Sequence, residues 1–294
     1  MRLRLRLWAA IALVAAATLP APARAESPSA ASSPTGTLAK IARQKVLRVG
    51  MFPGLAPFVA VGADAEELVR LSHGSAPIRA TDGRMVAGFD VDLAAAAARA
   101  LGARLEVVLV AQFDDLLPGL ERGAYDVVMS GLTRTLDRAR VVAFSDPYFA
   151  SGLQVLAPAT TRFSTLAALA AAHARVAVRA GTTGESFARS TLAGTAMRAL
   201  SSDDAVLAAV DRGEVDAAVI DYVSARDATV RGHVRTPLVP LEDRRFTVEH
   251  FAFAVRHNDG DWLGWLNLLL RETKASGEFH ALAARYNAWF RPER

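Results

Sequence analysis

The sequence of 294 residues contains no cysteine. This absence excludes disulfide bonds, thiol catalysis, cysteine-ligated metals and a lipid-modified N-terminal cysteine. The six histidines are scattered, without the four-residue spacing that places two metal ligands on one helical face. The chain also lacks a Walker motif, a Gly-x-Ser-x-Gly nucleophile elbow and a dinucleotide-binding fingerprint. We therefore expect no metal and no cofactor.

Long apolar runs are also missing, except at the start of the chain. Three arginines precede the apolar segment 7–19, and an Ala-x-Ala sequence ends at Ala25. This pattern is typical of a secretory signal peptide, so residues 1–25 should be removed on export. The apolar segment is too short to span a bilayer comfortably, and no other run of about 18 apolar residues occurs. We expect a bacterial periplasmic protein, cleaved after Ala25 and without a membrane anchor.

The net charge changes with that cleavage. Residues 1–25 carry four of the 34 basic residues and no acidic residue, which leaves 30 basic against 30 acidic residues. A near-neutral chain argues against a nucleic-acid-binding protein, which presents a basic face. Residues 26–37 are rich in Ser, Ala and Pro, and we expect a disordered leader over 26–39.

The most informative stretch is 126–148, DVVMSGLTRTLDRARVVAFSDPY. Its apolar start, 127–129, predicts a buried strand of a parallel sheet. Small and hydroxylated residues follow at 130–133, and Arg138 lies on a predicted helical turn opened by Thr135. Ligands of open α/β sheets bind at the carboxyl ends of the strands, so these groups predict a carboxylate receptor. Taken alone, the stretch also fits a strand, a loop and a solvated arginine.

A second unit of the same design occurs 90 residues later. LERGAYDVVMSG (120–131) and VDRGEVDAAVID (210–221) share Arg-Gly-x-x-Asp before an apolar strand. The second strand ends in Asp221, which could receive an ammonium group. Two such units predict two α/β lobes that face one another, although two ordinary helix–turn–strand units would produce the same echo.

The turn 180–185, Ala-Gly-Thr-Thr-Gly-Glu, stands between a predicted strand and a predicted helix. Its N–H groups lie at a helix N-terminus, where an anion is favoured. The turn also fits a plain helix cap made by Thr182 or Thr183. These candidates together would suit a zwitterion. They are Arg138, Thr133 and the N–H groups of Gly181–Thr183 for its carboxylate, and Asp221 for its ammonium.

Several segments match one known family in order and spacing. They are VLRVG…APF (46–58), GFDVDLA (88–94), DDLLPGLERGAYDVVMSGLTRT (114–135), Arg138, FSDPY (144–148), AGTTGESFA (180–188) and GEVDAAVID (213–221). From about Val46 to Phe290 the chain resembles the periplasmic amino-acid-binding proteins of ABC importers, solute-binding protein family 3. The implied partners are an amino-acid ligand and an inner-membrane ABC permease, and the implied state is a monomer.

The resemblance implies an α/β, two-lobed type II periplasmic-binding-protein fold, with two hinge strands and a ligand cleft between the lobes. Lobe 1 would comprise 40–152 plus 250–294, and lobe 2 would comprise 153–249. The segment 59–84 is longer than the usual family pattern, and we expect it near the mouth of the cleft.

The resemblance also assigns roles to residues. Arg138 would clamp the α-carboxylate, helped by Thr133 and the N–H of Thr183. Asp221 and the carbonyl region of Ser130 and Gly131 would hold the α-amino group. The expected contacts to the ligand side chain come from Phe113, from Arg179, and from the loop residues Phe52, Leu55 and Phe58, which are either pocket walls or packing residues.

Two other functions stay open from the sequence. Exported cyclohexadienyl dehydratases, which act on prephenate or arogenate, resemble this family as well. Such an enzyme needs a general acid near the leaving hydroxyl, and Glu185 and Glu249 are the candidates. Their other interpretations are a helix first-turn acid and a surface acid near the hinge. A sensory module that signals through a separate receptor would use the same fold.

Overall fold

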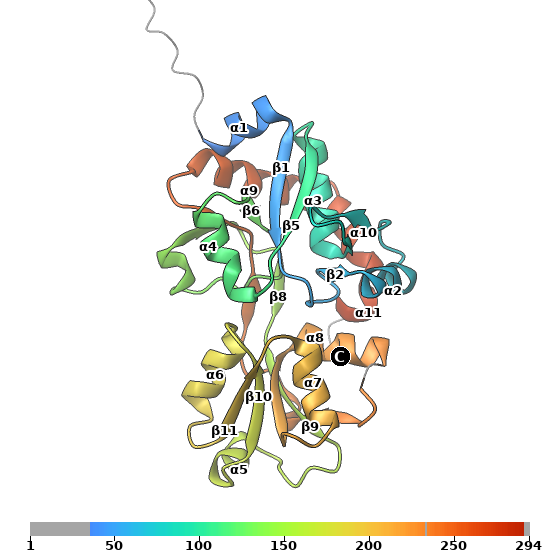
Figure 1. Ribbon diagram of the computed structural model, residues 1–294, viewed down its shortest axis with the longest axis vertical. Coiled ribbons are helices and arrows are strands. Elements are labelled where there is room, and N and C mark those ends of the chain that lie inside the picture. The colour runs from blue at the N-terminus through green and yellow to red at the C-terminus, as the bar shows by residue number, and fades with distance from the viewer. Residues whose placement is uncertain (1–35, 233, 291–294) are drawn as a thin grey trace, which may run out of the picture. The chain divides into compact units, whose positions relative to one another are not determined.

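The computed structural model describes residues 36–232 and 234–290, and the first of its sheets has five strands. These are β1 (Val46–Met51), β5 (Arg104–Leu109), β6 (Val127–Val128), β7 (Val142–Phe144) and β15 (Ala254–Arg256). Their order across the sheet is β5-β1-β6-β15-β7. Figure 1 labels the three neighbouring strands β5, β1 and β6. β1 pairs in parallel with β5 and β6, whereas β15 runs antiparallel to β6 and β7.

Helices pack on this sheet and on one another. They are α1 (Thr37–Gln44), α3 (Phe89–Ala100), α4 (Leu116–Glu121), α9 (Gly260–Ala275), α10 (Glu278–Arg285) and α11 (Asn287–Phe290). The alanine-rich sequence of α3 has a structural reason, because Ala94 and Ala97 are fully buried against the strands. Trp262 of α9 is also fully buried and donates its indole N–H to the carbonyl of Asp126 at 3.0 Å.

The second sheet has the order β11-β10-β12-β9-β13. Its strands are β9 (Leu153–Pro158), β10 (Arg175–Arg179), β11 (Ala196–Leu200), β12 (Ala217–Asp221) and β13 (Leu238–Pro240). Its helices are α5 (Leu166–Ala171), α6 (Thr183–Thr191), α7 (Asp203–Asp211) and α8 (Tyr222–Arg231). β12 pairs in parallel with β10 and antiparallel with β9. It therefore has one parallel and one antiparallel neighbour, as β6 does, so the 90-residue echo marks equivalent strands of the two sheets.

A two-stranded ribbon carries the chain between the two sheets. β8 (Phe149–Ser151) leads from β7 into β9, and β14 (Glu249–Phe251) leads from the second sheet back to β15. The two strands pair antiparallel, with Glu249 opposite Ser151. The chain therefore crosses twice, as the expected pair of hinge strands requires.

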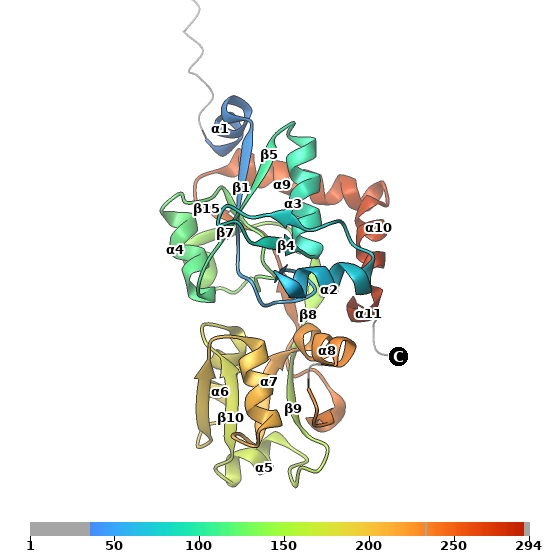
Figure 2. The ribbon, with the colours of Figure 1, turned by 45° about the vertical axis from the view of Figure 1, so that its right-hand side comes forward.

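The segment 59–84 and the three residues that follow it, 85–87, form a small sheet and a helix. β2 (Ala60–Val61), β3 (Ile78–Arg79) and β4 (Met85–Ala87) form a three-stranded sheet in the order β2-β4-β3, and α2 (Ala63–Ser72) contacts it. Arg231 of α8 forms ion pairs with Asp64 at 2.9 Å and Glu67 at 3.7 Å, so α2 lies beside α8 (Figure 2). The insertion thus contacts a helix that follows a strand of the second sheet.

Three short 3₁₀ segments, η1 (Phe113–Asp115), η2 (Arg138–Arg140) and η3 (Leu241–Asp243), complete the described elements. The N–H of Arg138 donates to the hydroxyl of Thr135 at 3.1 Å, as expected for a turn opened by that residue. The expected leader 26–39 needs a correction at its end, because α1 already begins at Thr37. The signal peptide and the leader up to residue 35 lie outside the described residues.

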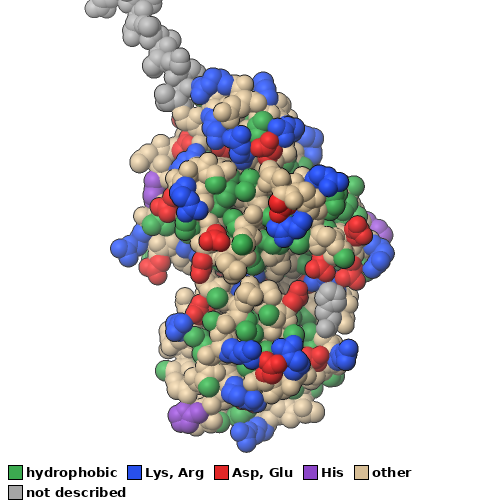
Figure 3. Space-filling model, viewed as in Figure 1, with side chains coloured by type: hydrophobic (Ala, Val, Ile, Leu, Met, Phe, Trp, Pro, Cys, Tyr) green, Lys and Arg blue, Asp and Glu red, His purple; other side chains and the backbone are tan. Residues whose placement is uncertain are grey.

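None of the helices within 36–232 and 234–290 is long and apolar enough to cross a bilayer. On the face that Figure 3 presents, lysine and arginine side chains are interspersed with aspartate and glutamate. That face carries no extended basic surface, in keeping with the balance of charged residues in 26–294.

Candidate functional site

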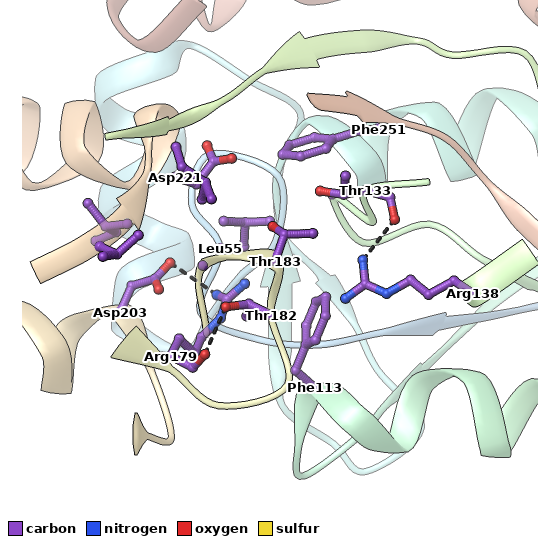
Figure 4. A pocket seen from close by; sticks show the side chains of 15 residues that line it. Leu55, Phe113, Thr133, Arg138, Arg179, Thr182, Thr183, Asp203, Asp221 and Phe251 are labelled. Carbon is purple, nitrogen blue, oxygen red and sulfur yellow. Dashed lines mark hydrogen bonds and ion pairs between the residues drawn. The ribbon is translucent and has the colours of Figure 1, made fainter. Parts of the chain in front are cut away.

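A pocket lies where strand ends of the two sheets approach one another (Figure 4). The first sheet contributes the loop after β6, with Gly131, Thr133 and Arg138. The second sheet contributes the ends of β10 and β12, with Arg179 and Asp221. This is the position at which open α/β sheets bind ligands.

A glycine turn fixes the first side of the pocket. Gly131 has a φ of +54°, and a Cβ added there would lie 2.2 Å from a methyl carbon of Leu55. Its N–H donates to Oδ2 of Asp90 at 2.6 Å, and the Tyr148 hydroxyl donates to the same oxygen at 3.0 Å. Burial raises the pKa of Asp90 to about 7, against the lowering effect of these two hydrogen bonds. Asp90 thus anchors the turn that leads into Thr133.

Arg138 spans the pocket from this side. Its Nη1 donates to the carbonyl of Thr133 at 2.7 Å, and its Nη2 donates to the carbonyl of Gly181 at 3.2 Å. The guanidinium lies over the ring of Phe113, 5.4 Å from its centroid. Burial lowers the pKa of Arg138 to about 10, so the side chain stays cationic at neutral pH. An anionic ligand would meet a partly desolvated positive charge here.

Asp221 provides the opposite charge at the end of β12. Its Oδ1 accepts hydrogen bonds from the Ser151 hydroxyl at 2.7 Å and from the N–H of Val223 at 2.8 Å. The second bond caps helix α8. The pKa of Asp221 is raised to about 7, mainly by burial and in part by the charges of Glu249 and Asp203, against the lowering effect of those two hydrogen bonds. A cation would stabilise its ionised form.

The first turn of α6 forms part of the wall. Thr182 is the N-cap residue, and its hydroxyl accepts from the N–H of Glu185 and donates to the carbonyl of Arg179. Thr183 begins the helix, and the early N–H groups of a helix have no acceptor within it. The cap and an anion-favouring helix terminus therefore coexist, as both interpretations of the sequence allowed.

Arg179 occupies the apolar end of the pocket. It is 7% exposed, and its guanidinium lies 4.9 Å from the ring centroid of Phe113 and 5.6 Å from that of Phe52. Its Nη1 pairs with Oδ2 of Asp203 at 3.0 Å, as Figure 4 shows. The buried Nε of Arg179 has no hydrogen-bond partner among the described residues.

Nine of the twelve residues predicted for the site lie on the pocket wall. They are Leu55, Phe113, Gly131, Thr133, Arg138, Arg179, Thr182, Thr183 and Asp221.

The other three lie behind the wall. Ser130 is buried and accepts a hydrogen bond from the N–H of Phe52 at 2.8 Å. Phe52 packs edge-on against Phe113 at 5.7 Å and supports Arg179. Phe58 is fully buried in an aromatic cluster with Phe149 and Phe251, so its expected place on a pocket wall is corrected to a place in the core. The local sequence could not separate these cases, because both surroundings are apolar.

Six wall residues were missed from the sequence: Leu153, Gly184, Asp203, Val219, Ile220 and Phe251. Asp203 is the informative one, because it neutralises Arg179. Asp203 begins a helix, where an acidic residue is common, so nothing in the sequence indicated its ion pair with Arg179. Among the described residues, no three histidine, aspartate or glutamate side chains lie close enough together to hold a metal ion.

Residues 69–290 match bacterial extracellular solute-binding proteins, family 3. The chain belongs to this family. One family relative, a probable histidine-binding protein of Neisseria gonorrhoeae, is 34% identical over 220 residues, which cover 72% of this chain and 80% of the relative. A crystal structure of a mutant of ArgBP from T. maritima matches with a TM-score of 0.71 and 32% identity, over 86% of this chain and 98% of that one. The fold is thus the two-lobed type II periplasmic-binding-protein fold, as predicted.

One of the proteins that this chain is similar to is an enzyme. A cyclohexadienyl dehydratase of Pseudomonas aeruginosa is 32% identical over 142 residues, which are 48% of this chain and 53% of the dehydratase. The similarity is therefore partial, whereas the relatives named as binding proteins match over most of their length.

Proposed function

We propose that this family member captures an amino acid between its two lobes in the periplasm and delivers it to an inner-membrane ABC permease. The observation that carries the proposal is the presence of a half-buried cation, Arg138, and a half-buried carboxylate, Asp221, on opposite sides of one pocket. A zwitterion complements this pair.

The charges explain why a zwitterion is favoured over a neutral ligand. A buried ion without a partner costs about 3–5 kcal/mol. In the ligand-free site Asp221 has only a hydroxyl and an N–H as partners, and burial raises its pKa. An ammonium group next to Asp221 and a carboxylate next to Arg138 would compensate both charges together. Closure of the lobes on such a ligand then becomes favourable.

Titration calorimetry with the twenty common amino acids tests the proposal directly. The names of the relatives put histidine, lysine and arginine first in that panel. Arg138→Ala should weaken binding of the tightest ligand by about 2–5 kcal/mol, or at least about thirtyfold in Kd. Arg140→Ala is the matched control, because Arg140 is exposed on the same 3₁₀ turn and does not line the pocket. Equal affinities of the wild type and Arg138→Ala would refute the assigned clamp.

The location and organisation of the chain belong to the same proposal. We propose export with cleavage after Ala25, lobe 1 over 40–152 plus 250–294, lobe 2 over 153–249, and a monomer without a nucleic acid partner. The two crossings of β8 and β14 support these lobe boundaries. The mass of the exported protein and limited proteolysis between the lobes would test the cleavage site and the boundaries.

A dehydratase is the second candidate function, favoured by the partial similarity to that enzyme. One candidate acid fits the role poorly. A hydrogen bond from the N–H of Gly181 lowers the pKa of Glu185, and a bond from Arg189 adds to this, so Glu185 holds no proton to donate at neutral pH. Incubation with prephenate and detection of phenylpyruvate would reveal the activity. A binding protein would give none, and ligand titration on the same sample would show that it is folded.

A further inference from the structure

The pocket holds a second pair of opposite charges besides Arg138 and Asp221. Nη1 of Arg179 donates to Oδ2 of Asp203 at 3.0 Å, and the hydroxyl of Ser224 donates to the same oxygen at 2.5 Å. Arg179 is 7% exposed and Asp203 is 8% exposed, and both line the pocket (Figure 4). Because the proposed function assigns the ligand carboxylate to Arg138 and the ligand ammonium to Asp221, this second pair is left to face the ligand side chain.

The surroundings of Arg179 are those of a bound cation. Its guanidinium lies 4.9 Å from the ring centroid of Phe113 and 5.6 Å from that of Phe52. Aromatic faces and a carboxylate are the groups that recognise a lysine or arginine side chain. In this pocket the protein's own arginine already contacts both rings and Asp203. A cationic ligand side chain would therefore find these partners already in use.

A charged ligand side chain of either sign would meet a like charge in this part of the pocket. The pKa of Arg138 is lowered to about 10, mainly by burial and in part by the positive charge of Arg179, so the two cations act on one another. A cationic side chain would add a third positive charge, whereas an acidic side chain would meet Asp203. Like charges brought together at a desolvated contact are strongly unfavourable.

The rest of the wall suits an uncharged side chain. Its apolar members, besides Phe113, are Leu55, Leu153, Val219, Ile220 and Phe251. A side chain without charge can bury apolar area against them, and it leaves the pair of Arg179 and Asp203 intact. The wall thus favours uncharged ligands, where charged ones are repelled.

We infer that Arg179, held by Asp203, occupies the place of a cationic ligand side chain, and that the ligand is an amino acid with an uncharged side chain. Arg179 is then a specificity-determining residue that rejects lysine and arginine. The inference rests on the proposed function, because it narrows the class of the same amino-acid ligand. It ranks the ligands differently from the names of relatives, which include lysine and arginine.

Titration calorimetry of the wild type with the twenty common amino acids and L-citrulline tests the inference without any substitution. Citrulline has nearly the shape of arginine and carries no charge on its side chain. We expect the tightest ligand to have an uncharged side chain, and citrulline to bind about tenfold or more tightly than arginine. Competition with the tightest ligand gives both dissociation constants where direct binding is weak. A tightest ligand with a charged side chain, or a preference for arginine over citrulline, would overturn the inference and leave the proposed function standing.

Arg179→Met should reverse the preference. Methionine keeps much of the packing against the two rings and leaves Asp203 as a buried carboxylate without its partner, so the guanidinium of a ligand can take that place. Relative to citrulline, arginine should gain about tenfold or more in affinity. The double variant Arg179→Met/Asp203→Asn should lose this gain, because no carboxylate remains to pair with the ligand.

Arg198→Met is the control, because Arg198 is exposed on β11, pairs with Glu214 and does not line the pocket. It should leave the ratio of the two affinities unchanged. The same ratio in Arg179→Met as in the wild type would overturn the inference, and so would an equal gain for arginine in the double variant. A folded wild type that binds no amino acid would overturn the proposed function, and the inference with it.

Discussion

Replacement of Asp221 by asparagine should stabilise the ligand-free protein while it abolishes tight ligand binding. Both hydrogen bonds to this side chain end on the same oxygen, Oδ1, which accepts from Ser151 and from Val223. An asparagine carbonyl can accept both bonds and cap α8 equally well. Asp221→Asn therefore removes the charge and leaves the packing in place.

The size of the stabilisation follows from the pKa of Asp221. Burial raises this pKa from 3.8 to about 7 in the folded protein. A raised carboxyl pKa means that the folded state holds the proton more tightly than the unfolded state, so stability is complete below about pH 4 and is lost as the pH rises to about 7. A shift of about three units corresponds to at most about 4 kcal/mol, and we expect about 1–4 kcal/mol at pH 8.

Urea unfolding of the ligand-free proteins at pH 5 and pH 8 measures this difference. Subtraction of the wild-type curve is needed because Asp90, with a pKa also raised to about 7 by burial, gives a similar pH dependence in both proteins. Asp137→Asn serves as a control for the loss of an exposed carboxylate. The reasoning is refuted if Asp221→Asn is no more stable than the wild type at pH 8, or if the two proteins lose stability in parallel between pH 5 and pH 8.

Two further predictions concern residues outside the charge pair. Arg231→Met should cost about 3–5 kcal/mol in urea unfolding, because the Arg231 side chain is 4% exposed and its loss leaves the buried Asp227 without its ion pair at 2.8 Å. The double variant Arg231→Met/Asp227→Asn should recover much of this stability, and no recovery would contradict the argument. Asp64→Asn, at the exposed end of the same ion-pair network, should cost only about 1 kcal/mol or less. Gly131→Ala should destabilise by about 1–3 kcal/mol and weaken ligand binding, because it combines a positive φ with a contact of 2.2 Å to Leu55. Gly123→Ala shares the positive φ but meets no atom within 4 Å, so equal effects on ligand binding in calorimetry would count against the steric argument.

The strand ends were predictable from the sequence because they depend on local patterns. The apolar runs before Ser130 and Asp221, each after an Arg-Gly-x-x-Asp turn, mark β6 and β12, which have equivalent places in the two sheets. Ligands bind at the carboxyl ends of such strands. This rule predicts from the sequence that Thr133, Arg138 and Asp221 lie at one pocket, and all three line it.

Contacts between distant segments were not predictable in the same way. Phe58 and Leu55 lie in one loop, and only packing against Phe149 and Phe251 decides that Phe58 enters the core. The ion pair between Arg179 and Asp203 joins the ends of two different elements of the second lobe. Neither residue type nor spacing indicates this partner, because an acid at a helix start already has a local explanation.

The direction of the hydrogen bonds in the site is harder to predict than its residues, because it depends on which group donates each proton. By residue type, Thr133, Thr183 and Arg138 suggest three donors for a carboxylate. In the ligand-free protein, however, each of these side chains already donates to an acceptor of the protein. Arg138 donates to two backbone carbonyls, and the two threonine hydroxyls donate to Glu249. Arginine has five N–H groups, so it keeps donors for a ligand after two bonds, whereas a threonine keeps none after one. Residue types alone therefore do not determine which groups of this pocket remain free to donate to a ligand, because that depends on contacts between distant segments.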